Sequence, residues 1–319
     1  MSENNKKILG ILPHSIAGRL IVKSMLDGFE QNGFNFDVYD ELKQDNFLEF
    51  ISNKDYNYIT GYDFSPLKLK VDNDLRIPCV CYFADEIEST ASGVFEDWQK
   101  YLPYLSEDKN FTFYWDRALA EKSNVKNLYY MPQFVNTEVY KPLNLEKEYD
   151  IMFAGRLDTD FRLNFFIELM QHFPNLKFAW YAIEKHYQDA LSRTNEEGQE
   201  LLKQAYKGFI DNEPDMAVAI NKAKFMFTMN SQGLSSLNHR TVQAVACKTL
   251  VVSDFREELN IYKGDLPFYI NMGDLVEKIN YYMQNEKAYE YTVNKCYEIA
   301  SKYLSAEYCV KCMLKVMGN

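Results

Sequence analysis

The sequence predicts an α/β fold built from two parallel β-sheets, each covered by helices on both faces. Short apolar runs typical of buried strands alternate with helical segments in both halves of the chain. A proline-containing stretch, Pro132–Pro142, interrupts this alternation near the middle. The length of 319 residues exceeds the size at which a single core usually stops growing, so we expect two domains.

The first half contains six apolar segments that we interpret as strands: Ile8–Leu12, Phe36–Tyr39, Tyr56–Gly61, Cys79–Phe83, Phe111–Trp115 and Leu128–Met131. The loop after the first strand precedes a helix over residues 20–31, and it lacks the three glycines of a dinucleotide fingerprint, which weakens an NAD-binding interpretation. Ser15, Gly18 and Arg19 of this loop could still approach a ligand. An ordinary connection explains them equally well.

Acidic residues follow the fourth predicted strand. Asp85 and Glu86 would lie at the carboxyl edge of the first sheet, where open α/β folds bind their ligands. A carboxylate at this edge can act as a general base or orient a hydroxyl group. His14, at the corresponding edge of the first strand, is a rival acid/base candidate.

The second half repeats the strand–helix order from Tyr149 onward. The predicted strands are Tyr149–Ala154, Leu176–Tyr181, Phe225–Met229 and Leu250–Ser253, with helices over residues 161–172, 184–204, 272–284, 286–303 and 306–317. Gly155 and Arg156 form a tight turn after the first of these strands. The polar run that follows Pro142 places the boundary between residues 145 and 146.

The stretch Phe225–Asp254 is the most informative part of the chain. A buried strand is followed by a polar loop over residues 230–238, a helix that Ser236 or Asn238 could cap, and a second strand. The positive end of the helix dipole and its first N–H groups suit an anion. Arg240 in the first turn could bind phosphate oxygens in a bidentate way, so we interpret this junction as a diphosphate site.

Composition excludes several classes of protein. A formal net charge of -11 argues against a nucleic-acid backbone binder. No apolar run reaches the roughly 18 residues that would span a bilayer, and none resembles a signal peptide, so we expect a cytoplasmic protein without a transmembrane segment.

The Cys309–Cys312 pair is interpreted as two buried small side chains. Asp158 and Asp160 have the spacing of a metal-binding pair but serve equally well as helix caps, so we predict no metal site.

The ordered motifs resemble those of one glycosyltransferase family. The blocks YYMPQFVNTEVYKP, YDIMFAGR, YKGFI and LNHRTVQAVACKTLVVSDFREEL are similar to the CgeB-like (spore-maturation) glycosyltransferases, relatives of family 4. The resemblance covers most of the chain from Val125 onward. It implies a GT-B architecture, in which two Rossmann-like domains face a cleft. The N-terminal domain would comprise residues 1–145 joined by the C-terminal helix 304–319, and the nucleotide-sugar domain residues 146–303.

The resemblance also implies a set of binding residues. Gly155 and Arg156 match the family's glycine turn near the diphosphate, and the segment Gly208, Phe209 and Ile210 matches the one that flanks the nucleobase. Asn238 and Arg240 match the junction that meets the phosphates. The implied nucleotide-sugar site contains Ser15, Gly18, Gly155, Arg156, Tyr181, Gly208, Phe209, Ile210, Asn238, His239, Arg240 and Gln243. Two departures stand out: Gln243 replaces a glutamate that holds the ribose hydroxyls, and Lys248 replaces a common glycine.

These observations predict a metal-independent glycosyltransferase of the hexosyl or N-acetylhexosaminyl class, without a cofactor. It would move a sugar from a nucleoside diphosphate donor, most simply a UDP-sugar, to a glycan, protein or small-molecule acceptor. Arg240 would stabilise the leaving diphosphate. Asp85, Glu86 or His14 would orient or deprotonate the acceptor. Two alternatives stay open: a catalytically silent nucleotide-sugar binder or assembly protein, and a nucleotide-sugar epimerase.

Overall fold

The computed structural model describes residues 6–44, 46–85, 94–123, 125–231 and 233–318. Glu86 lies outside these ranges. The chain forms two compact units, one made of residues 1–136, 232–236 and 303–319, the other of residues 137–231 and 237–302, as far as these are described. We call them the N-terminal and C-terminal units and describe each by itself.

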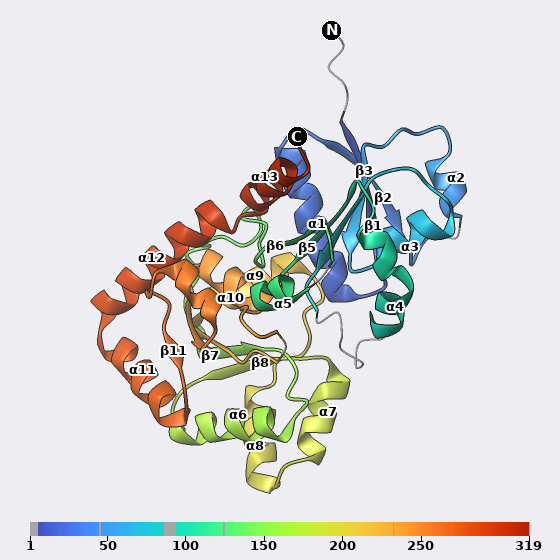
Figure 1. The fold of residues 1–319 in the computed structure, drawn as a ribbon. Helices are drawn as coiled ribbons and strands as arrows, with labels where there is room; N and C mark the ends of the chain where they lie inside the picture. Colours follow the sequence, from blue (N-terminus) through green and yellow to red (C-terminus); the bar gives the residue numbers. More distant parts are fainter. Residues whose placement is uncertain (1–5, 45, 86–93, 124, 232, 319) are drawn as a thin grey trace. The chain divides into compact units, whose positions relative to one another are not determined.

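The N-terminal unit contains a six-stranded parallel sheet in the order β2-β1-β3-β4-β5-β6 (Figure 1). The strand order reverses direction beside β1, so the chain is wound outward in both directions, as in other open α/β sheets. The strands are β1 (Lys7–Leu12), β2 (Asn35–Asp40), β3 (Tyr58–Tyr62), β4 (Cys79–Phe83), β5 (Asn110–Tyr114) and β6 (Leu128–Tyr130).

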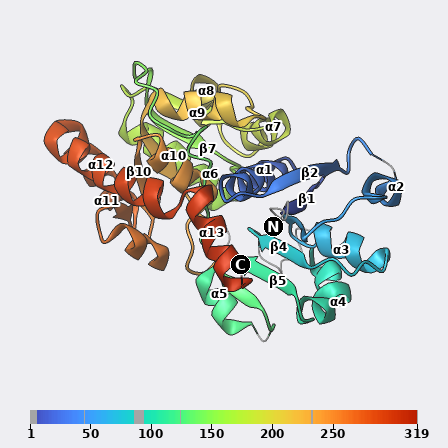
Figure 2. The ribbon, with the colours of Figure 1, turned by 90° about the horizontal axis from the view of Figure 1, so that it is seen from above.

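Helices cover both faces of this sheet. On one face α1 and α13 pack over Ile8, Val80 and Phe113, while α2 and α3 cover Leu9, Ile11 and Ile59 on the other (Figure 2). The helices of this unit are α1 (Ile16–Gln31), α2 (Phe47–Ile51), α3 (Ser65–Asp72), α4 (Val94–Leu105), α5 (Arg117–Lys122) and α13 (Ala306–Val316).

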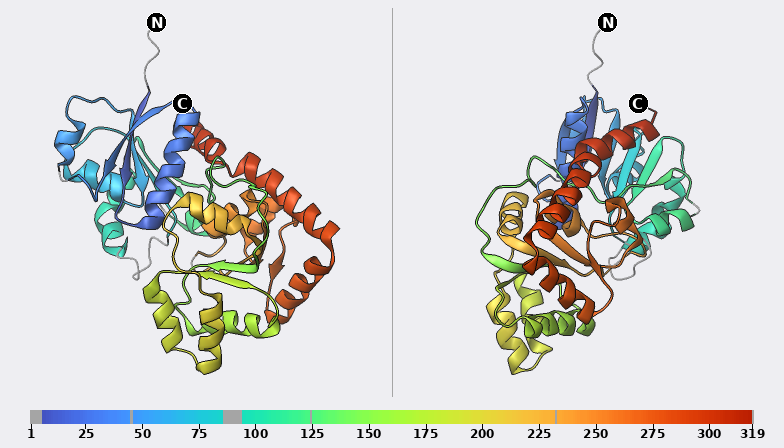
Figure 3. Two further views of the ribbon diagram at one scale, coloured as in Figure 1. Left: turned by 180° about the vertical axis from the view of Figure 1, so that it is seen from behind. Right: turned by 90° about the vertical axis from the view of Figure 1, so that its left-hand side faces the viewer.

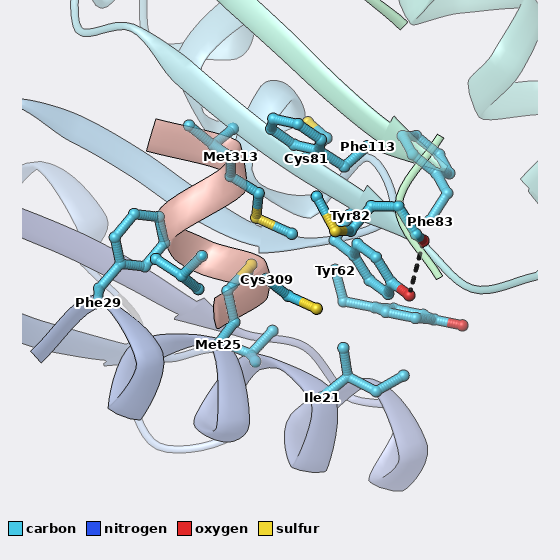
Figure 4. Packing of buried hydrophobic residues seen from close by; sticks show 14 of the residues in the cluster. Ile21, Met25, Phe29, Tyr62, Cys81, Tyr82, Phe83, Phe113, Cys309 and Met313 are labelled. Carbon is cyan, nitrogen blue, oxygen red and sulfur yellow. Dashed lines mark hydrogen bonds between the residues drawn. The ribbon is translucent and has the colours of Figure 1, made fainter. Parts of the chain in front are cut away.

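The C-terminal helix α13 completes the core of the N-terminal unit. Met313 and Cys309 point toward Met25 and Phe29 of α1 (Figure 4), and the thiol of Cys309 is buried. The two helices approach closely at Gly28, where an added Cβ would lie 2.6 Å from the backbone oxygen of Ala306.

The C-terminal unit contains a five-stranded parallel sheet in the order β11-β10-β9-β7-β8. Within this unit α6 packs beside α8 and α11, and α9 packs beside α10 (Figure 3). The strands are β7 (Tyr149–Ala154), β8 (Phe178–Tyr181), β9 (Ala223–Thr228), β10 (Leu250–Asp254) and β11 (Phe268–Tyr269). The helices are α6 (Asp160–His172), α7 (Glu184–Ser192), α8 (Glu196–Ala205), α9 (Glu213–Asn221), α10 (His239–Ala246), the short 3-10 helix η2 (Glu257–Tyr262), α11 (Met272–Gln284) and α12 (Glu286–Tyr303).

Two helix predictions need correction. The helix expected over residues 184–204 is two helices, because Asn195 accepts the N–H of Gly198 and starts a new helix there. The helix expected from Leu20 begins at Ile16, since Ser15 caps it through its hydroxyl oxygen. The parallel two-sheet α/β class is confirmed.

Candidate functional site

Three predicted segments meet at the carboxyl edge of the C-terminal sheet. The N–H of Gly155, just after β7, donates to the carbonyl of Tyr181 at 3.1 Å, and the indole N–H of Trp180 donates to the carbonyl of Gly155 at 3.0 Å. The N–H of Ala182 in turn donates to the carbonyl of Gly208 at 3.0 Å. These bonds hold the glycine turn and the segment from Gly208 side by side, where ligands of parallel sheets bind.

The segment Gly208–Ile210 offers backbone and an apolar side chain at this edge. Gly208 has a φ of +97°, a conformation that favours glycine, and nothing lies where its Cβ would stand. Phe209 is 47% exposed. Burial and the neighbouring phenol of Tyr149, at the start of β7, raise the pKa of Tyr181. The contact of Tyr181 with the glycine turn is made by its backbone carbonyl, which accepts the N–H of Gly155.

Arg162 is a buried cation at the same edge of the C-terminal sheet. It is not among the site residues that the sequence predicts. Its Nη1 donates to Asp158 at 3.1 Å and its Nη2 to the carbonyl of Met229 at 3.3 Å, yet its Nε has no partner among the described residues. Burial lowers the pKa of Arg162, partly offset by Asp158. A signal was present: Arg162 lies four positions before Phe166, on the buried stripe of the helix.

The side chain of Asn230 links the ends of β9 and β10 to the start of α10. Its amide group donates to Asp254 at 2.7 Å, and its oxygen accepts the N–H of Asn238 at 2.8 Å. Arg256 donates to the carbonyl of Asn230 at 3.1 Å and pairs with Asp254 at 3.2 Å. Neither Asn230 nor Arg256 was singled out from the sequence, because both lie in short loops without a motif.

The start of α10 has the predicted cap. Asn238, not Ser236, accepts the N–H of Thr241 at 3.2 Å, and His239 begins the helix. The guanidinium of Arg240 is half-buried and donates from Nη1 to the amide oxygen of Gln243 at 2.6 Å. Burial lowers the pKa of Arg240, while Tyr140 and Glu213 act in the opposite direction. Arg240 is thus held within the unit rather than pointing into bulk water.

The two departures from the family pattern have different structural settings. Gln243 is fully buried, and its amide nitrogen has no hydrogen-bond partner among the described residues. Lys248 follows Cys247, the C-cap of α10, and has a φ of +55°, the left-handed conformation that glycine adopts without strain. This explains a glycine preference at that position, and the ammonium group of Lys248 lies 4.8 Å from the ring centre of Tyr297.

The backbone N–H groups of the polar loop before α10 donate to a carboxylate of the protein itself. The Oδ2 atom of Asp116 accepts the N–H groups of Leu234, Ser235 and Ser236 at 2.7, 2.9 and 3.1 Å. Burial alone would raise the pKa of Asp116, but these backbone donors outweigh it and lower the pKa. Residues 233–236 therefore belong to the N-terminal unit, and their N–H groups serve Asp116.

In the N-terminal unit, the predicted residues of the first loop have structural partners. Ser15 caps α1, and Gly18 is buried with its Cα so near Tyr62 that a Cβ would lie 2.6 Å from the ring. Arg19 pairs with Asp40 at 2.7 Å, which holds the pKa of that carboxyl well below its usual range. His14 is exposed.

Asp85 lies where the sequence predicts, just beyond β4. Its Oδ2 accepts a hydrogen bond from the hydroxyl of Tyr62, the last residue of β3. Glu86, its predicted companion, lies outside the described residues.

The acidic pair after β7 is engaged by arginines. Asp158 pairs with Arg156 and Arg162, and Asp160 pairs with Arg193 at 3.0 Å. Within the described ranges, no group of three or more His, Cys, Asp or Glu side chains could hold a metal ion. No described helix is long and apolar enough to cross a membrane.

Part of the chain is similar to a known family of proteins. Residues 162–314 match a family model described as glycosyl transferase-like. No curated protein matches the chain. The C-terminal part of the chain is thus similar to glycosyl transferase-like domains.

Solved structures share the whole fold at low sequence identity. A sucrose-phosphate synthase from Thermosynechococcus elongatus aligns with a TM-score of 0.73 at 11% identity, covering 98% of both chains. HepE from Anabaena in complex with UDP aligns at 0.70 with 11% identity over 98% of this chain and 99% of that one. The T4 phage protein BGT, in complex with UDP and Mn2+, aligns at 0.62 with 12% identity over 98% and 100%. The fold is the GT-B fold.

Proposed function

We propose that this protein, whose residues 162–314 form a glycosyl transferase-like domain on a GT-B fold, transfers a hexosyl or N-acetylhexosaminyl group. The donor is a nucleoside diphosphate sugar, UDP-linked in our proposal, and the acceptor is a hydroxyl group of a glycan, a protein or a small molecule. We also propose the finer relationship to the CgeB-like branch, from the motifs listed above.

The observation that best supports this function is the setting of Arg162. A buried guanidinium with an unpartnered Nε is costly unless a ligand group completes it. It lies beside the glycine turn, with Arg156 on the same loop and Arg256 at the end of β10. Phosphate oxygens are suited to this arrangement, because guanidinium groups bind them through parallel, charge-assisted hydrogen bonds.

In the proposed reaction these groups stabilise the leaving diphosphate. As the bond between the anomeric carbon and the diphosphate oxygen breaks, negative charge grows on that oxygen. Arg162, Arg240 and the positive end of α10 are already oriented before the charge develops, so little reorganisation is needed. Gly208 and Phe209 would flank the base of the donor.

Calorimetry with UDP tests the donor site. We expect saturable binding by the wild-type protein and a loss of about tenfold or more in affinity for Arg162→Gln, since a charged hydrogen bond to phosphate contributes about 1.5–3 kcal/mol. Arg193→Gln is the matched control, because Arg193 lies by the same loop but bonds to Leu157, Asp160 and Asp189. Equal affinities for all three proteins would contradict the proposal.

Transfer itself is measured with a panel of UDP-sugars and hydroxyl acceptors. We expect turnover that persists in EDTA, because the arginines supply the positive charge that a metal supplies elsewhere. Turnover that stops in EDTA and returns with a divalent ion would remove the metal-independent part of the proposal and leave the donor site in place.

A second candidate function, a nucleotide-sugar binder without activity, is favoured by Gln243. Its side chain is neutral and fully buried. The CgeB-like glycosyltransferases, which this chain resembles, usually have a charged glutamate at this position. Tight UDP-sugar binding without transfer to any acceptor would support this candidate. Isomerised donor formed without an acceptor would instead indicate an epimerase.

A further inference from the structure

Three polar side chains, those of Tyr62, Asp63 and Asp85, lie at the carboxyl edge of the N-terminal sheet and interact with one another. The loop after β1, the end of β3 and the end of β4 meet at Tyr62, which is 4% exposed. The ring of Tyr62 packs against the Cα of Gly18, where a Cβ would overlap it. Tyr62 therefore has a fixed position between α1 and the strand ends.

The hydroxyl of Tyr62 is used to hold a carboxylate. It donates a hydrogen bond to Oδ2 of Asp85, so one oxygen of Asp85 is anchored from the neighbouring strand. A phenol bonded in this way fixes the orientation of the carboxylate and stabilises its charged form. Burial raises the pKa of Tyr62, and the carboxylate of Asp85 adds to this effect, so the phenol keeps its proton and remains a donor.

Asp63, the next residue along the chain, is unusual in two ways. Its backbone has a φ of +51°, a left-handed conformation that costs free energy in most residues other than glycine. Its Oδ1 atom is buried and has no hydrogen-bond partner among the described residues. A charged carboxylate would be unfavourable there, because an ionised oxygen loses its hydration without compensation.

Burial and the acidic neighbours of Asp63 favour its neutral form. Burial and the neighbouring Asp85 raise the pKa of Asp63 well above its usual range, with a smaller contribution from Asp97 of α4. Lys68 of α3 opposes them, but Lys68 is itself paired with Asp97. Two neighbouring carboxyl groups resist ionising together, so the proton stays on Asp63, whose Oδ1 is buried without a hydrogen-bond partner among the described residues.

We propose that Asp85 is the general base of the acceptor reaction, that Tyr62 positions it, and that Asp63 stays protonated beside it so that the single negative charge resides on Asp85. The proposal rests on the proposed glycosyl transfer and chooses Asp85 over the exposed His14. It assigns roles to Tyr62 and Asp63 that no sequence motif indicates.

The proposed step balances as follows for a hydroxyl acceptor. The acceptor oxygen forms a bond to the anomeric carbon while the bond from that carbon to the diphosphate oxygen breaks. The nucleoside diphosphate leaves with the electron pair, and the acceptor proton moves to Asp85. A neutral Asp63 matters because a second charge beside Asp85 would oppose the approach of the electron-rich acceptor oxygen.

Four variants test these roles: Asp85→Asn, Tyr62→Phe, Asp63→Asn and the control Tyr101→Phe. Tyr101 is a matched control because it is also buried in the N-terminal unit and donates to a carboxylate, Asp72, in another place. Each variant is assayed for the pH dependence of kcat, for UDP-sugar hydrolysis without acceptor, and for UDP affinity by calorimetry, which also reports folding of the donor site.

We expect Asp85→Asn to lower kcat for transfer about 100-fold or more with unchanged UDP affinity, as for loss of a general base. Tyr62→Phe should lower kcat and change its pH profile, because Asp85 loses the hydrogen bond that fixes its orientation. Asp63→Asn should lower kcat far less than Asp85→Asn does, since the amide resembles the neutral acid. Tyr101→Phe should change neither kcat nor its pH profile.

Specific results would overturn the inference. An active Asp85→Asn variant removes Asp85 as the base, and a Tyr62→Phe profile identical to that of Tyr101→Phe removes its positioning role. An Asp63→Asn variant as inactive as Asp85→Asn shows that Asp63 itself carries the charge. In each case UDP binding and wild-type transfer persist, so the proposed function survives. If the wild-type protein neither binds UDP nor transfers a sugar, the proposed function fails and this inference fails with it.

Discussion

The carboxylate of Asp116 accepts the backbone N–H of Ser235 at 2.9 Å, joining positions 119 residues apart in the sequence. The hydroxyl of Ser235 also donates to Asp116, and that of Ser236 donates to the carbonyl of Trp115 at 2.7 Å. The chain leaves the C-terminal unit after β9, is held here in the N-terminal unit, and returns to begin α10. Asp116 therefore fixes the segment that leads directly into the residues of the candidate donor site.

Asp116→Asn should destabilise the protein by at least about 2 kcal/mol, because several buried N–H groups lose their acceptor. Ser235→Ala, which removes the hydroxyl but keeps the backbone bond, should cost less. Urea unfolding at neutral pH measures both. Because the pKa of Asp116 is lowered by folding, its stabilisation is present above the ordinary carboxyl pKa and is lost as the pH falls through the folded value. A difference between wild type and variant that does not shrink in acid would contradict this.

Asp63→Asn should have the opposite effect on stability. The pKa of Asp63 is raised by folding, so stability is lost as the pH rises from about 3.9 toward the folded value, by up to about 1.4 kcal/mol per pH unit. The variant avoids this loss, so it should be more stable than wild type at pH 7, with the difference vanishing near pH 4. Asp74→Asn is the control, because Asp74 is exposed and also has a positive φ, +49°. Equal effects of the two substitutions in urea unfolding would refute the prediction.

Gly28→Ala should displace α13 from α1. The new Cβ would lie 2.6 Å from the backbone oxygen of Ala306, and overpacking of this kind typically costs about 1–3 kcal/mol. Gly273→Ala, in the first turn of α11, is the control, since its Cβ would meet only the side-chain oxygen of Asn271 at 3.4 Å. Thermal unfolding should show a Tm below that of the wild-type protein for Gly28→Ala. Gly273→Ala should not lower the Tm. Similar Tm values for both would show that the two helices can separate without cost.

Arg240→Met should weaken UDP binding and also reduce stability by about 1–3 kcal/mol, because Gln243 loses the donor to its buried oxygen. The double variant Arg240→Met/Gln243→Leu separates these effects. Replacing both partners with apolar side chains leaves no unsatisfied group, so stability should return while UDP binding stays weak. Recovery of UDP affinity in the double variant would show that Arg240 serves only to satisfy Gln243.

Much of the site could be located from the sequence but not assembled. The strand–loop–helix order around Asn238, and the glycine turn at Gly155, follow from local patterns and are present in the structure. Arg162 was missed because a single arginine in an amphipathic helix is ordinarily solvent-exposed. No local pattern indicates that the N–H groups of Leu234, Ser235 and Ser236, in the loop before α10, donate to Asp116.

The sequence by itself determined the class of fold, the order of the main strands in both halves, and the strand–loop–helix order that leads into α10. These depend on the periodicity of apolar side chains and on caps within a few residues, which are local information. Only the tertiary structure decided that Arg162 is buried with an unpartnered nitrogen, that Tyr62 holds Asp85, and that Asp116 reaches Ser235. Each of these depends on desolvation and on contacts between distant segments, which no local pattern records.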